Sequence, residues 1–228
     1  MGGGKIDVYM DIVSLYSYLA FLDLQRNSEL LKAHNVEVEF HPVLLGAINV
    51  GSGNKPPWTL PAKAIYGAHD ARRSIARFPG LVIQTPKDLM AISKTIVPNR
   101  ALHFIKSHHP ASTFLTTLHY LMHLFWSPPN LNLTLPENVA KALLECPETF
   151  DGSEKEGTNL NDGKKLLFTK TQVEEIIKGT ETPPVKEALK KATQEALESG
   201  AFHFIYKFLD LPFQDVTLLP PGGKEAKL

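Results

Sequence analysis

The sequence lacks the features that mark several large classes of protein. It has one cysteine, Cys146, so it can form neither an internal disulfide nor a Cys-x-x-Cys redox pair. Lysine plus arginine and aspartate plus glutamate number 24 each, so the basic excess of nucleic-acid-binding proteins is missing. No apolar run approaches the ~20 residues that a membrane-spanning helix needs. We therefore expect no nucleic-acid partner and no membrane span.

What the chain does contain is typical of a folded globular protein. Hydrophobic residues make up 43% and charged residues 21% of its 228 residues. This length fits one domain, or a core with an inserted subdomain, and about 70% of the surface could be buried on folding. The composition excludes a disordered chain, a collagen and a coiled-coil rod.

The first 42 residues predict a strand, a helix and a second strand. Residues 5–12 alternate between apolar and polar side chains, and residues 36–40 alternate again. Between them, the apolar run of residues 16–24 is typical of a helix, with Ser14 or Ser17 in place as the N-cap. Because a helix connects the two strands, we expect them to run parallel.

The rest of the chain reads mainly as helices. Residues 43–61 are rich in glycine and proline and predict a long loop, which marks a candidate functional segment. Helical patterns follow at residues 62–78 and, with the most apolar face, at residues 113–126. The last long helix should begin after Thr182 and end at Gly200.

Ser14 is the central candidate for chemistry, because it lies where the first strand turns into the first helix. Backbone N–H groups and the helix dipole favour an anion at this point, where thioredoxin-type proteins hold a cysteine thiolate. A serine hydroxyl cannot exchange disulfides, but it can donate a hydrogen bond to a thiolate of a ligand. Such a bond is worth about 1.5–3 kcal/mol and could lower the pKa of a bound thiol by about 1–2. The alternative is that Ser14 only caps the helix.

A second candidate segment lies farther along the chain. Asn54 could offer its amide to a peptide-like ligand, and Lys63 could pair with a carboxylate. A solvated lysine on the flank of a helix is the alternative for Lys63. Trp58 and Phe78 could line a pocket for an acceptor substrate, but core packing explains them equally well.

The remaining candidates predict no metal site. His119 and His123 are spaced four residues apart on one helix, as zinc ligands can be. Tyr120 stands where a His-Glu-x-x-His motif has its glutamate, and no third ligand is evident. We interpret both histidines as half-buried or interfacial, and Cys146 as a small apolar residue at a helix end.

Two motifs carry a resemblance to a known family. Residues 9–21 (YMDIVSLYSYLAF), and residues 52–57 (SGNKPP) with 60–63 (LPAK), resemble motifs of kappa-class glutathione transferases and their 2-hydroxychromene-2-carboxylate isomerase relatives. The likeness covers about residues 5–202.

The family implies an α/β fold in which a thioredoxin-like domain of the DsbA type is interrupted by an inserted all-α domain. In this chain it predicts a thioredoxin-like domain from residues 1–61 and 183–215, a helical insertion at 62–182 and a tail at 216–228.

The resemblance also implies an activity. Ser14 resembles the serine that faces the glutathione sulfur, assisted by the helix amides near Tyr16 and Ser17, while Asn54 and Lys63 resemble glutathione-binding residues. The protein would be a homodimeric glutathione transferase whose thiolate attacks an electrophile or a peroxide. Two alternatives stay open: a glutathione-dependent isomerase of an aromatic metabolite, and a catalytically impaired, truncated homologue that acts only as a binding or structural protein.

The sequence departs from the family in two places. Leu15 stands where the family often has proline, which is a mild change. After Gly-Ala-Phe the family continues with a cis-proline, a β-hairpin, Gly-Ser-Asp and a final helix. Here residues 200–202 (GAF) run directly into residues 203–209, which resemble that final helix. We therefore expect a truncated sheet, reduced stability and much weakened glutathione affinity.

The C-terminus suggests a location. Ala226, Lys227 and Leu228 form a variant of the Ser-Lys-Leu peroxisomal address, and the family includes peroxisomal members. We expect a peroxisomal protein, with a mitochondrial or cytoplasmic location, or a tail that no receptor reads, as the alternatives.

Overall fold

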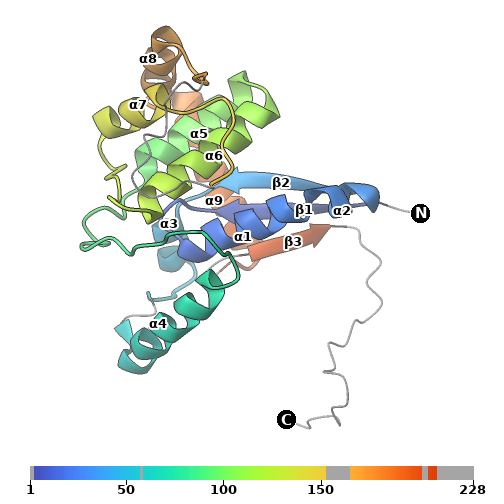
Figure 1. Cartoon of the computed structure of the whole chain (residues 1–228), viewed down its shortest axis with the longest axis vertical. Coiled ribbons are helices and arrows are strands. Elements are labelled where there is room, and N and C mark those ends of the chain that lie inside the picture. The colour runs from blue at the N-terminus through green and yellow to red at the C-terminus, as the bar shows by residue number, and fades with distance from the viewer. Residues whose placement is uncertain (1–2, 57–58, 153–164, 202–204, 210–228) are drawn as a thin grey trace.

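The computed structural model describes residues 3–56, 59–152, 165–201 and 205–209 of the chain (Figure 1). The strands in these ranges are β1 (Gly4–Met10), β2 (Val36–Pro42) and β3 (Ile205–Leu209). The helices are α1 (Leu15–Arg26), α2 (Ser28–Ala33), α3 (Leu45–Gly51), α4 (Pro61–Ile75), α5 (Ile96–His108), α6 (Ala111–Trp126), α7 (Pro136–Leu144), α8 (Lys170–Gly179) and α9 (Pro183–Glu198). Among the residues described, no helix is both long and apolar enough to cross a membrane.

The strand–helix–strand unit at the N-terminus is confirmed. β1 and β2 pair in parallel, with Ile6 opposite Val38 and Val8 opposite Phe40. Ile6, Val8 and Met10 are buried, as the alternation predicts, but Asp7 and Tyr9 on the other face are buried as well. Parallel strands need a crossover of a dozen or more residues, which the segment containing α1 and α2 supplies.

The sheet has a third strand that the sequence reasoning missed. Residues 205–209 form β3, antiparallel to β1, so the strand order is β2-β1-β3. Our expectation that residues 203–209 resemble a final helix was therefore wrong for 205–209. The segment is rich in aromatic and β-branched residues, which favour strands, and the second edge of β1 has backbone groups that need partners.

The segment after β2 also differs from the prediction. We expected a loop over residues 43–61, but residues Leu45–Gly51 form helix α3. Ile48 of α3 is buried beside Ala192 and Ala196 of α9. This apolar contact explains why the helix forms although glycine, a poor helix former, stands near each of its ends.

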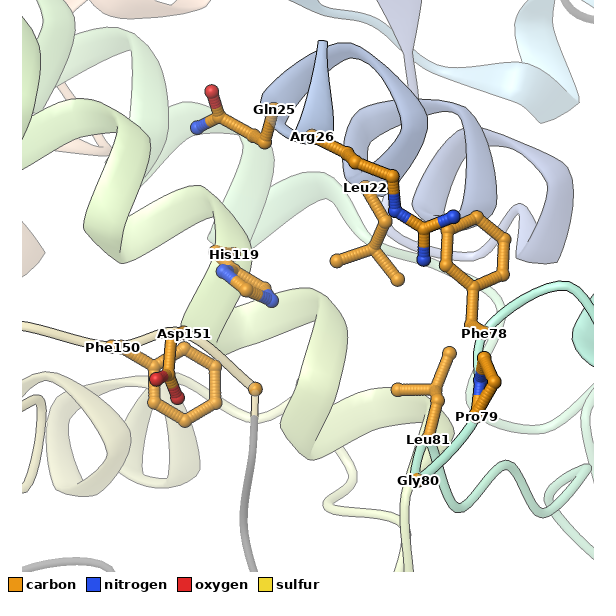
Figure 2. Close-up of a pocket in the computed structure, with 11 residues that line it drawn as sticks. Leu22, Gln25, Arg26, Phe78, Pro79, Gly80, Leu81, His119, Phe150 and Asp151 are labelled. Atoms are coloured by element: carbon orange, nitrogen blue, oxygen red, sulfur yellow. The ribbon is translucent and has the colours of Figure 1, made fainter. Parts of the chain in front are cut away.

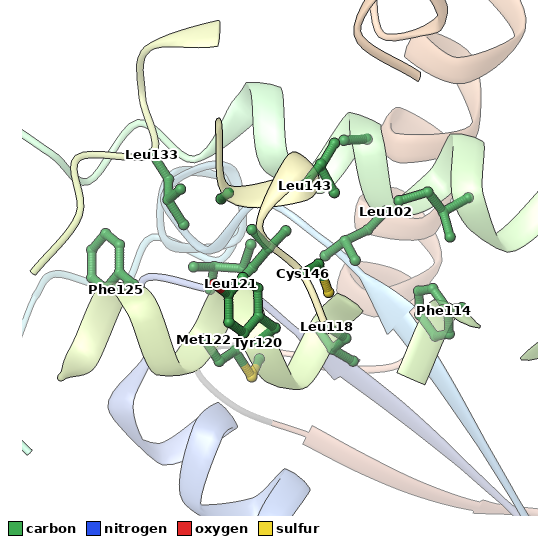
Figure 3. Close-up of a cluster of buried hydrophobic side chains, with 14 of the residues drawn as sticks. Leu102, Phe114, Leu118, Tyr120, Leu121, Met122, Phe125, Leu133, Leu143 and Cys146 are labelled. Carbon is green, nitrogen blue, oxygen red and sulfur yellow. The ribbon is translucent and has the colours of Figure 1, made fainter. Parts of the chain in front are cut away.

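The main hydrophobic core lies between the sheet and the helices, with α6 at its centre (Figure 3). The predicted apolar face of α6 is confirmed, because all five of its members are buried: Phe114, Leu118, Leu121, Met122 and Phe125. Ile6, Val8 and Met10 of β1 reach the same core from the sheet. The residues of α6 therefore hold the inner face of the sheet in place.

Helix α9 covers part of the other face of the sheet, where Tyr9 packs with Val43, Ala192 and Ala196. Its predicted cap position is confirmed, with Thr182 as N-cap and proline in the first turn. The buried positions of its stripe are Val185, Leu189, Ala192 and Ala196, and Lys186, Lys190 and Lys191 are exposed. α9 thereby packs against β1.

The same face carries a network of charged side chains. Lys5 of β1 contacts Glu39 at 2.6 Å and Asp7 at 3.1 Å, and Lys106 of α5 contacts Glu39 at 2.7 Å. His41 Nε2 lies 2.8 Å from an Asp7 carboxylate oxygen. Partial burial works to raise the pKa of Glu39, but the hydrogen bonds from Lys106 and Lys5 lower it to about 2.

This network predicts a loss of stability in acid. The Glu39 carboxyl has a pKa of about 2 in the folded chain against 4.5 for the reference carboxyl, so its contribution is complete above pH 4.5. That contribution is lost as the pH falls from 4.5 towards 2. Glu39→Gln should therefore flatten the fall in Tm over this range. Glu37→Gln, an exposed neighbour on the same strand, is the control and should leave the fall unchanged. Equal slopes for wild type and Glu39→Gln would contradict this account.

Several sequence-based expectations fall outside the described residues. These are Trp58, the tail at residues 216–228 and its last three residues, Ala226, Lys227 and Leu228. The division into a thioredoxin-like domain and a helical insertion stays a prediction.

Candidate functional site

Ser14 caps the first helix at the turn between β1 and α1. Its backbone is extended, with φ −94° and ψ 113°, and its Oγ accepts a hydrogen bond from the Ser17 amide at 3.2 Å. Because this bond uses a lone pair of Oγ, the hydroxyl hydrogen can still donate to another group. Ser14 itself is buried, with 6% of its surface exposed.

The turn that carries Ser14 is braced by the buried carboxylate of Asp11. One oxygen accepts from Thr95 Oγ1 at 2.5 Å and Asn99 Nδ2 at 2.8 Å, both from the start of α5. The other oxygen accepts from the Leu45 amide of α3 at 2.7 Å. The Asp11 carbonyl accepts from the Ser14 amide at 3.0 Å. Asp11 therefore joins the Ser14 turn to two other helices.

The electrostatics of Asp11 follow from these contacts. Complete burial raises the pKa of its carboxyl, and the donors Thr95, Leu45 and Asn99 oppose that rise. The described partners of the side chain are all donors, an arrangement that suits an ionised carboxylate.

A second brace comes from α6. The Trp126 indole Nε1 donates to the Ile12 carbonyl at 2.9 Å, in a buried hydrogen bond. On the opposite side, the Val43 amide donates to the Met10 carbonyl at 2.9 Å. Backbone groups on both sides of Asp11 are thus tied to other elements, so the position of the Ser14 backbone is fixed before any ligand binds.

Tyr16 connects the first turn of α1 to α4. Its hydroxyl donates to Asp70 Oδ2 at 2.6 Å, and Asp70 also contacts Arg73 at 3.0 Å. Burial, together with this hydrogen bond, raises the pKa of Tyr16 to about 12, so the phenol stays protonated at neutral pH. The helix α4 has no buried residue, and the Tyr16–Asp70 bond is therefore an important tie between α4 and the body of the protein.

Removing this bond should loosen α4. Tyr16→Phe is expected to speed tryptic cleavage after the exposed Arg72 and Arg73 several-fold, because local opening exposes the backbone. Tyr66→Phe is the matched control, since the Tyr66 hydroxyl bonds to Arg73 within α4 itself. Cleavage of Tyr16→Phe at the wild-type rate would show that α4 is held by other contacts.

The structure places Asn54 and Lys63 on either side of the connection into α4. Asn54 is half-buried after α3, and its Nδ2 donates to Asn49 Oδ1 at 3.3 Å. Lys63 lies in the first turn of α4, is exposed, and forms no ion pair with a described residue. Lys63 and Asp70 are seven residues apart and share a face of α4. Through the Tyr16–Asp70 bond, that face is tied to the start of α1.

One group of described residues has metal-ligand chemistry, but it lies elsewhere. Asp7, Glu39 and His41 offer ligand atoms that lie within 4.8 Å of one another. The ammonium groups of Lys5 and Lys106 already contact these carboxylates, so the cluster is satisfied as an ion-pair network.

The remaining chemical candidates are buried. His119 and His123 are 7% and 8% exposed, and burial lowers the pKa of each to about 4. Burial raises the pKa of Cys146 to about 12, so its thiol is inert at neutral pH. The interpretation of Cys146 as a small buried residue is confirmed.

Sequence reasoning missed Asp11 and Asp70. Asp11 could have been predicted as a buried, hydrogen-bonded carboxylate. It directly follows a buried strand and stands three positions before a helix cap, and an acidic residue in such a place needs hydrogen-bond donors. Asp70 could not have been predicted in this way, because its partner Tyr16 is 54 residues away in the sequence.

Comparison with known proteins is consistent with this geometry. Residues 5–129 match the family model described as DSBA-like thioredoxin domain. Human glutathione S-transferase kappa 1 is 29% identical over 202 residues, covering 86% of this chain and 77% of the human protein. The Caenorhabditis elegans protein of the same name is 38% identical over 82 residues, covering 36% of this chain and 35% of its own length.

A solved structure has the same fold. A 2-hydroxychromene-2-carboxylate isomerase superposes with a TM-score of 0.61 at 15% sequence identity, covering 90% of this chain and 84% of the isomerase. The fit extends beyond the residues of the family model into the C-terminal helices.

Proposed function

We propose that the chain, which belongs to the DsbA-like thioredoxin-domain family, is a glutathione transferase of the kappa type. The observation that carries this proposal is the place of Ser14, at the N-cap of α1 on a braced turn. A hydroxyl there can donate to a sulfur anion without first moving the backbone.

The proposed role of Ser14 is to stabilise the ionised thiol of glutathione. The thiol proton leaves to solvent, and the Ser14 hydroxyl then donates a hydrogen bond to the thiolate. The first turn of α1 carries no acidic residue, so the positive end of its dipole adds to this effect. The thiolate forms a bond from sulfur to an electrophilic carbon, and the leaving group departs with its bonding electrons.

We propose that Asn54 and Lys63 bind the rest of the tripeptide. Glutathione carries two carboxylates, and Lys63 supplies an exposed ammonium group that no described carboxylate neutralises. Asn54 supplies an amide that can both donate to and accept from a peptide group. Tyr16 contributes its backbone amide from the first turn of α1, and the Ser17 amide, which donates to Ser14 Oγ, orients the Ser14 hydroxyl.

Binding of glutathione should be weak. The segment between Gly200 and β3 is too short to hold the hairpin, with its cis-proline, that the family uses against the glutathione backbone. In a thermal-shift titration we therefore expect no clear rise in melting temperature at low-millimolar glutathione. A clear rise there would show that other residues replace the missing contacts.

The activity is tested by conjugation of excess glutathione to a generic aryl halide. We expect conjugate to form faster than in the uncatalysed reaction, and we expect Ser14→Ala to lose this rate enhancement.

A second candidate, isomerisation of an aromatic metabolite, is favoured by the likeness to the isomerase structure. Glutathione-dependent turnover of a hydroxychromene carboxylate without conjugation would favour that candidate. If the chain shows neither conjugation nor isomerisation, it is a non-catalytic homologue. The homodimer stays a prediction.

A further inference from the structure

A cavity of about 720 Å³ lies beside the C-terminal half of α1 (Figure 2). Its wall combines Arg26 of α1, the segment 78–81, His119 of α6 and residues 150–152. Cavities that hold small molecules are usually about 300–1,000 Å³, mostly apolar and fitted with a few polar groups. The size and the lining of this cavity both match that description.

The cavity is separate from Ser14. Ser14 caps the start of α1, whereas Leu22, Gln25 and Arg26 lie 8–12 residues farther along the same helix. At about 1.5 Å per residue, this separation is about 12–18 Å along the helix axis. Ser14 does not line the cavity, so a ligand bound there would not touch the proposed thiolate site.

The walls of the cavity suit a flat apolar body. Leu22 and Leu81 face the space from two elements, and the rings of Phe78 and Phe150 lie at opposite ends (Figure 2). Aromatic rings gain from stacked or edge-to-face contact with another ring. This pair of rings favours an aromatic ligand over a flexible chain.

Arg26 gives the cavity a positive charge at its rim, and the carboxylate of Asp151 lies at the other end, beside Phe150 (Figure 2). Its guanidinium lies over the Phe78 ring, 4.9 Å from the centroid, and its two terminal nitrogens lie 3.5 Å from the Arg77 carbonyl, at the limit of a hydrogen bond. Asp23 is paired with Arg77, and Arg26 forms no ion pair with a described residue. Its planar guanidinium can therefore donate hydrogen bonds to a carboxylate of a ligand.

His119 supplies a polar group at the other side. The residue is 7% exposed, and its ring points into the cavity (Figure 2). Its Nε2 is buried and makes no hydrogen bond to any residue in the described ranges. A buried ring nitrogen without a partner is costly, and a polar atom of a bound molecule would satisfy it. The imidazole is neutral at pH 7, because burial lowers its pKa to about 4.

From these features we propose that the cavity is a second small-molecule site that binds an aromatic carboxylate. The carboxylate pairs with Arg26, the ring lies between the Phe78 and Phe150 side chains, and a polar substituent meets His119 Nε2. The site is distinct from the glutathione site proposed above and does not depend on that proposal.

The test is calorimetric titration of the full chain with 2-naphthoate. We expect saturable one-site binding that Arg26→Gln weakens about tenfold or more, because the charge-assisted hydrogen bonds are lost. Arg77→Gln is the matched control, since Arg77 also lies over the Phe78 ring, at 5.6 Å, but does not line the cavity. It should bind 2-naphthoate within about twofold of wild type. Leu81→Trp, which fills the cavity from its rim, should also weaken binding.

Two further arms separate this site from the glutathione site. Ser14→Ala should bind 2-naphthoate like wild type, and excess glutathione should not displace it. The proposal is overturned if wild type shows no saturable binding, if Arg26→Gln binds as tightly as wild type, or if glutathione or Ser14→Ala removes the binding. Arg26→Gln should leave glutathione conjugation unchanged, so failure of this site would leave the transferase proposal standing.

Discussion

Replacing Ser14 with alanine is expected to cut the turnover of glutathione conjugation by more than tenfold. The hydroxyl would supply a charge-assisted hydrogen bond to the thiolate, worth about 1.5–3 kcal/mol, and a tenfold change in rate corresponds to about 1.4 kcal/mol. The measurement is kcat with an aryl halide at excess glutathione. Turnover equal to wild type would remove Ser14 from the mechanism.

A matched variant separates this role from helix capping. Ser14→Ala also removes the cap that accepts the Ser17 amide, at a cost of about 1 kcal/mol in the free energy of unfolding. Aspartate caps a helix about as well as serine, but its carboxylate cannot donate to a thiolate. Ser14→Asp should therefore stay as inactive as Ser14→Ala while recovering the stability that the cap provides. Activity in Ser14→Asp would identify Ser14 as a cap and nothing more.

The largest effect on stability is expected at Asp11. Asp11→Ala leaves the part-buried Leu45 amide and the buried Thr95 hydroxyl without their acceptor. Each unpaired buried donor costs about 1–3 kcal/mol, so we expect a loss of about 3 kcal/mol or more in the free energy of unfolding. For a chain of this size, that loss lowers Tm by about 6–12 °C.

The control for Asp11 is Asp23 of α1, an aspartate that pairs at the surface. Asp23→Asn removes an ion pair with Arg77, which lies 59% exposed, and should cost at most about 1 kcal/mol. Asp11→Asn keeps the size of the side chain and should lose less stability than Asp11→Ala. Its kcat should still fall, because the brace on the Ser14 turn is altered. Asp11→Ala as stable as Asp23→Asn would contradict the role given to Asp11.

The parts of the fold that local patterns determine were predictable from the sequence. Alternating residues in β1 and β2 and the serine before α1 were enough to give the parallel unit and the position of Ser14. The predicted apolar face of α6 is likewise confirmed. In each case the sequence pattern that predicts the element lies within that element or directly beside it.

The parts that depend on distant partners were not predictable. β3 is stabilised by pairing with β1 about 200 residues earlier, and no local pattern in residues 205–209 specifies that edge. Helix α3 depends on the fit of Ile48 against α9. The bonds of Asp11 reach Thr95 and Asn99, which are 84 and 88 residues away. The cavity beside Arg26 likewise joins segments that only the folded chain brings together.

The central claim is that the Ser14 hydroxyl holds the glutathione sulfur in its ionised form. It is tested most directly by titrating the ultraviolet absorbance of the thiolate against pH in the complex with glutathione, for wild type and Ser14→Ala. We expect the thiol of bound glutathione to have a pKa about 1–2 below that of free glutathione in the wild type, and to return close to the free value in Ser14→Ala. An equal thiol pKa in the two complexes would contradict the account.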